Sequence, residues 1–89
     1  MKVLKLIKNP FGGIDEQAMT EQLERVIGIN RCFRLKDIYS SAQNSSSGNR
    51  YQLHSHKIMT TEEYFIKAAT RERFVRTEID AYLDYISVV

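Results

Sequence analysis

The chain has 89 residues and a single cysteine, Cys32, so no intrachain disulfide can hold its fold together. No group of cysteines and histidines has the spacing of a structural zinc site either. A domain of this size buries a modest core and is marginally stable without such cross-links. We therefore predict one domain, residues 1–89, which depends on burying its apolar faces and gains stability either from a partner or from self-association as a homodimer.

The composition is that of an ordinary globular protein, with 43% hydrophobic and 27% charged residues. A lone thiol fits a reducing compartment. The first apolar run is short and interrupted by lysine, unlike a secretory signal or a membrane span. We expect a cytoplasmic protein, of the cell or of a host cell, with no membrane partner.

Alternation of apolar and polar residues predicts three strands. The first covers Lys2–Lys8, where lysines alternate with aliphatic residues. Arg31–Tyr39 and Arg50–Met59 also alternate, the second less regularly. Between them, residues 40–49 contain five serines, two asparagines and a glycine, and are too polar to pack. This pattern predicts a long hairpin around a mobile serine-rich loop.

A first helix is predicted between the turn Asn9–Gly13 and Gly28. Asp15 can cap its free N–H groups, and Gly28 suits the residue that ends it. The turn lies where phosphate-binding loops occur, but it lacks their glycine–lysine spacing, and Glu16 adds unfavourable charge. We therefore expect a plain turn.

A second helix is predicted after Thr60, because Thr60 and Glu63 have the spacing of a capping box. Its apolar stripe, broken only at Glu72, continues for about 25 residues, or roughly 37 Å. Such a helix either breaks near residues 70–73 or packs on a second copy. Three aromatic residues beside the stripe either close the core or form an oligomer interface: Phe74, Tyr82 and Tyr85.

The predicted order of elements is therefore βαββα, with a fourth strand if residues 85–89 are extended. A small α+β domain buries these faces by placing both helices on one face of a three- or four-stranded antiparallel sheet. With the fourth strand, the arrangement is ferredoxin-like.

Basic residues are concentrated in the first two thirds of the chain, where nine Lys and Arg face five Asp and Glu. Strand alternation places several on the face opposite the core, so an anionic partner such as a nucleic-acid backbone can be attracted there. No aromatic residue shares that face, which excludes base stacking. The candidate contact residues for nucleic acid or another partner are Arg31, Arg34, Lys36, Arg50, His54 and His56.

His54 and His56 are two residues apart, so a strand would present both rings on one face. They lack a third metal ligand, because the alternation puts Asp37 on the opposite face. They are an acid–base pair for RNA cleavage if Arg34 or Lys36 binds the phosphate. The competing interpretation is two polar residues on a solvated face.

No catalytic set, cofactor motif or metal site is evident in the sequence. This absence favours a non-catalytic binding or regulatory protein that docks on a protein or nucleic-acid partner, as short regulators of phages and mobile elements do. A small metal-independent ribonuclease that uses His54 and His56 is the alternative.

Overall fold

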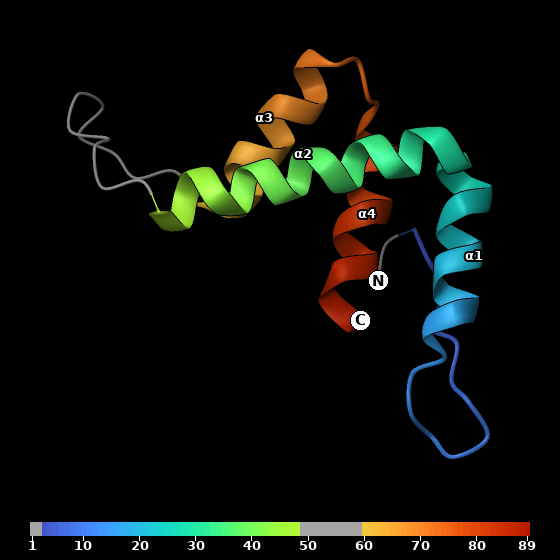
Figure 1. Ribbon diagram of the computed structural model, residues 1–89. Coiled ribbons are helices and arrows are strands. Elements are labelled where there is room, and N and C mark those ends of the chain that lie inside the picture. Colours follow the sequence, from blue (N-terminus) through green and yellow to red (C-terminus); the bar gives the residue numbers. More distant parts are fainter. Residues whose placement is uncertain (1–2, 49–59) are drawn as a thin grey trace.

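The computed structural model describes residues 3–48 and 60–89, which form four helices. These are α1 (Glu16–Ile27), α2 (Ile29–Gly48), α3 (Thr61–Arg71) and α4 (Arg76–Val88). The long α2 crosses the molecule; α3 packs against it, and α1 and α4 lie next to each other on one side of it (Figure 1). The predicted α+β fold is wrong, because the described residues contain no strand beyond an isolated bridge between Lys8 and Ile14.

The segment Arg31–Tyr39, predicted as a strand, lies entirely within α2. The strand pattern placed Phe33 and Leu35 on one buried face, yet Phe33 is 60% exposed and Leu35 is 0% exposed. Among the side chains of α2 up to residue 44, the buried ones are Leu35, Ile38 and Ala42, which recur at helical spacing. Nine residues are too few to separate the two periods, and burial against α3 decides for the helix.

The other predicted sheet elements differ as well. Residues 3–8 form an irregular arm, and the predicted mobile loop at 40–49 is replaced, as far as residue 48, by the end of α2. Most of residues 85–89, the candidate fourth strand, belong to α4. The third predicted strand, Arg50–Met59, lies outside the described residues. A ferredoxin-like sheet therefore has no counterpart in the described chain.

The predicted starts of the two helices at Asp15 and Thr60 are confirmed, as is the end of the first before Gly28. The Asp15 carboxylate accepts a hydrogen bond of 3.0 Å from the Ala18 N–H at the start of α1. Thr60 and Glu63 form the expected capping box at the start of α3. The predicted long helix breaks after Arg71, and Arg73 adopts a left-handed conformation with φ of 69° before α4 begins.

The hydrophobic core is centred on three aromatic rings, one from each of α2, α3 and α4. The Tyr39 and Phe65 rings meet edge to face at 5.3 Å between centroids. Tyr82 lies 5.4 Å from Phe65 and 5.9 Å from Tyr39. These distances are typical of favourable aromatic pairs. Buried apolar side chains from all four helices, the arm and the α3–α4 connection complete the core: Leu4, Met19, Leu23, Ile27, Leu35, Ile38, Ala42, Ala69, Phe74, Ile79 and Ala81.

Gly28 is the single residue between α1 and α2, and the chain turns sharply there (Figure 1). Its φ of 99° is open to glycine but strained for other residues. The Gly28 N–H still bonds to the Glu24 carbonyl at 2.7 Å, and its own carbonyl accepts from the Cys32 N–H at 2.8 Å. The corner therefore keeps its hydrogen bonds while the chain changes direction.

We expect Gly28→Ala to lower the free energy of unfolding by about 1–2 kcal/mol, the usual cost of positive φ in a residue with a Cβ. A Cβ at this position would meet no atom within 4 Å, so a steric clash does not contribute to the loss. Urea denaturation measures it. Ser40→Ala, on the exposed side of α2, is the control and should change stability by less than about 0.5 kcal/mol. An equally small change in Gly28→Ala would contradict the strained corner.

Candidate binding surfaces

Arg31 and Arg34, predicted to contact an anionic partner, are each held by a carboxylate of the chain itself. Arg31 donates from Nε and Nη2 to both oxygens of Glu78, at 3.0 and 2.7 Å. Arg34 makes the same two-pronged contact with Glu72. Glu72 caps the end of α3 and Glu78 lies in the first turn of α4, so much of this positive charge is compensated internally.

Arg31 also packs against an aromatic ring, in addition to its hydrogen bonds with Glu78. Its guanidinium carbon lies 4.4 Å from the centroid of the Phe74 ring, a cation–π distance. Phe74 itself is buried, as is Tyr82, and both belong to the core rather than to an exposed surface. Of the three residues predicted for an oligomer interface, Tyr85 is the one that is partly exposed.

The remaining predicted contact residues are divided between the surface and the part of the chain that is not described. Lys36 is exposed on α2. Arg50, His54 and His56 lie outside the described residues, so their roles in nucleic-acid contact or RNA cleavage stay predictions. Within residues 3–48 and 60–89, no group of three or more His, Cys, Asp and Glu side chains is placed to hold a metal ion.

A groove opens where α1, α2 and α4 meet, with a volume of about 130 Å³. The Thr20 and Tyr85 hydroxyls are hydrogen-bonded at 2.9 Å, joining the α1 and α4 sides. Phe33 lines the groove although more than half of its surface is exposed. We call this feature the α1–α2–α4 groove; it is lined by Thr20, Leu23, Glu24, Cys32, Phe33, Lys36, Tyr82 and Tyr85.

The chemistry of the groove is that of a mainly apolar surface. Burial raises the pKa of the Cys32 thiol, and the nearby Glu24 carboxylate raises it further. Burial also raises the pKa of Tyr82 to about 12. Both groups are therefore neutral at pH 7, and Cys32 is not activated as a nucleophile. The volume is well below the roughly 300 Å³ at which small-molecule sites begin, so the groove suits a side chain better than a cofactor.

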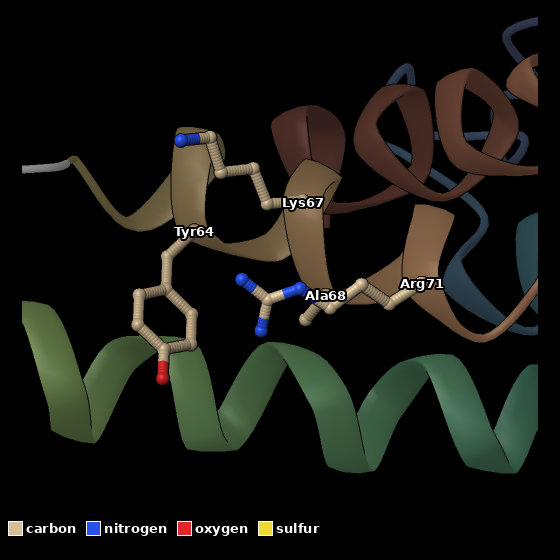
Figure 2. A pocket seen from close by; sticks show the side chains of 4 residues that line it. All are labelled: Tyr64, Lys67, Ala68 and Arg71. Carbon is tan, nitrogen blue, oxygen red and sulfur yellow. The ribbon is translucent and has the colours of Figure 1, made fainter.

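A second pocket, of about 110 Å³, lies along α3 and is lined by Tyr64, Lys67, Ala68 and Arg71. The Arg71 side chain folds back toward Tyr64 above α2, whereas the Lys67 ammonium points away from it (Figure 2). Because the two cations diverge, they do not form a clamp for one anion.

The turn Asn9–Gly13 extends beyond the start of α1 (Figure 1). The Asn9 side-chain oxygen accepts hydrogen bonds from the N–H groups of Phe11 and Gly13, at 2.9 and 3.0 Å. These donors are therefore occupied and do not face a phosphate, which agrees with the plain turn expected. Phe11 is 95% exposed at its tip, which no pattern in the sequence had indicated.

Comparisons with protein-family models, with curated proteins and with solved structures gave no match. Within residues 3–48 and 60–89, none of the helices combines the length and the apolar character that crossing a bilayer requires.

The Arg31–Glu78 pair predicts a pH dependence of stability. Hydrogen bonds from Arg31 hold the pKa of Glu78 below its ordinary value of 4.5. A depressed folded-state pKa stabilises the fold above the unfolded-state pKa, and this contribution is lost as the pH falls through the folded-state value. We expect Glu78→Gln to lower the free energy of unfolding by about 1 kcal/mol at pH 7. The difference in free energy of unfolding between the variant and the unchanged protein should narrow below pH 4.5.

Urea denaturation at a series of pH values measures this difference. Glu21→Gln, on the exposed side of α1, is the matched control. Its free energy of unfolding should differ little from that of the unchanged protein at every pH. A difference for Glu78→Gln that stays constant from pH 7 to well below pH 4.5 would contradict the assignment.

Proposed function

We propose that this chain is a non-catalytic binding or regulatory protein that docks on a protein partner through the Phe11 turn. The observation that carries the proposal is the 95% exposure of Phe11 at the tip of a hydrogen-bonded turn. An aromatic side chain held in water gains much of its burial free energy when a partner covers it. Buried aromatic anchors also dominate the energetics of many protein interfaces.

The turn is preorganised for this role. Besides the two bonds to the Asn9 side chain, the Asn9 N–H donates to the Gly13 carbonyl at 2.7 Å. The Asp15 N–H donates to the Ile7 carbonyl at 2.9 Å and closes the base of the turn. A loop already ordered in its free state loses less conformational entropy on binding, which favours affinity.

The arm that leads into the turn is also fastened to the helices. The Gln22 side chain accepts from the Lys5 N–H at 2.7 Å and donates to its carbonyl at 2.8 Å. The Val3 N–H donates to the Asp84 carboxylate at 2.8 Å. These contacts hold Phe11 at a defined place relative to α1 and α4.

Charge near the turn indicates the kind of pocket that would receive Phe11. Lys5 and Lys8 are exposed, and no ion pair within the described part of the chain includes either of them. The nearby Asp15 carboxylate caps α1 instead. An apolar pocket bordered by acidic side chains would complement both the ring and the lysines.

The described residues give little support to the other candidate functions. Arg31 and Arg34 are paired with Glu78 and Glu72, which weakens the case for a basic nucleic-acid face. The neutral Cys32 thiol gives no support to nucleophilic catalysis. A ribonuclease would depend on His54 and His56, which lie outside the described residues.

Site-specific photo-crosslinking in the source cell tests the proposal. A photoreactive phenylalanine analogue at position 11 should give one discrete protein adduct, because Phe11 enters a pocket of the partner. The same analogue at Val75, which is 59% exposed at the start of α4, is the matched control and should not give that adduct. Equal adducts at both positions, or none at position 11, would contradict the proposal.

Incubation of the purified protein with labelled RNA separates the alternatives. Cleavage that disappears in both His54→Ala and His56→Ala would establish the ribonuclease and overturn a non-catalytic function. Retention of RNA that weakens with added salt, without cleavage, would favour an electrostatic nucleic-acid interface. We expect neither result.

A further inference from the structure

From the α1–α2–α4 groove we infer that two copies of this chain form a symmetric dimer in which Phe33 of each copy fills the groove of the other. This dimer is independent of the Phe11 turn, because it uses a different surface. One face of the molecule carries a projecting ring, a cavity for a ring, and charges of both signs.

Phe33 is the projecting group. It lies at the edge of the groove and is 60% exposed, so its own groove does not bury it. Ile29, one helical turn earlier on the same face of α2, is 57% exposed. Adjacent exposed apolar side chains of this size gain burial when a second copy covers them.

The groove is a suitable cavity for that ring. Its volume of about 130 Å³ accommodates part of one side chain. On the α4 side, the partly exposed Tyr85 lines the groove, and its ring lies 6.1 Å between centroids from that of the buried Tyr82. A phenylalanine entering from outside would therefore meet the Tyr85 ring, and aromatic pairs add to the free energy gained from area burial.

The charges on the groove are self-complementary. Glu24 lines it from α1 and Lys36 lines it from α2. Within the described residues, no ion pair of 4.0 Å or less joins Glu24 and Lys36 to each other or to another side chain. In a two-fold interface, a contact between residues i and j occurs twice, once in each direction. Lys36 of each copy can therefore face Glu24 of the other, whereas two like charges would repel.

The size of the chain gives a thermodynamic reason for such a contact. A domain of 89 residues without a disulfide has a modest core. Covering Phe33, Ile29 and the groove adds apolar burial that the monomer cannot provide. By mass action, the folded state is then stabilised as the protein concentration rises.

Light scattering over a concentration series tests the dimer. We expect the mass to rise from 10.4 kDa toward twice that value. Phe33→Ala should raise the dissociation constant at least about tenfold. Because Phe33 is exposed, the variant should keep its helical circular dichroism. Val75→Ala removes an equally exposed apolar side chain elsewhere and should leave the constant unchanged. A mass of 10.4 kDa throughout, or equal effects of the two substitutions, would overturn the inference.

Charge reversal provides a second test that a folding defect cannot imitate. Glu24→Lys and Lys36→Glu should each weaken the dimer, because each places like charges opposite one another across the two-fold axis. Mixing the two variants should restore association. The cation at position 24 of the first variant would then face the carboxylate at position 36 of the second, and the other pair in the mixed dimer is unchanged.

The mixture should therefore reach a higher mass than either variant alone at the same total concentration. Two results would contradict the proposed interface: both variants associate as strongly as the unchanged protein, or the mixture is no heavier than either variant alone. Either result would show that the copies do not associate through the α1–α2–α4 groove.

Discussion

The meeting of Tyr39, Phe65 and Tyr82 is the contact on which the rest of the fold depends. Each ring comes from a different helix, so the three together place α2, α3 and α4 around one point without a sheet as support. Tyr85 packs against Tyr82 and so extends the cluster, and its hydroxyl is hydrogen-bonded to Thr20 of α1. In a chain with so small a core, the loss of any ring would leave a cavity that the neighbours cannot fill. The α1–α2–α4 groove lies beside this cluster, because Tyr82 belongs to both.

The arginine–glutamate pairs show how stabilising contacts change what a surface can bind. Arg31 and Arg34 approach the ends of α3 and α4, where the chain breaks between the two helices. There they satisfy carboxylates and, in one case, cover an aromatic ring. A guanidinium engaged in two hydrogen bonds is less available to a phosphate than a free one. Basic residues counted in one segment of a sequence therefore overstate the local positive charge that a partner meets.

Parts of the fold and of the surfaces were predictable from local chemistry. The caps at Asp15 and Thr60 depend on side-chain oxygens three residues from the N–H groups that they satisfy, and both were identified. The break of the last helix was one of two stated outcomes. A signal for the arginine pairs existed too, because Glu72 interrupts an apolar stripe and implies a partner across the interface. Lys36 and Tyr85 were named as contact residues, but nothing in the sequence indicated that they line one groove.

By itself, the sequence determined where α1 and α3 begin and where α1 ends, because capping and turn conformations are settled within a few residues. It also determined a small, largely aliphatic and aromatic core without a covalent cross-link. Only the tertiary structure decided between strand and helix for residues 31–39, and hence whether Phe33 is core or surface. The physical reason is that a short amphipathic segment fits either period, and the neighbour that buries it selects one. In this chain the neighbour is α3, and because the buried face of α2 is that of Leu35 and Ile38, Phe33 faces outward.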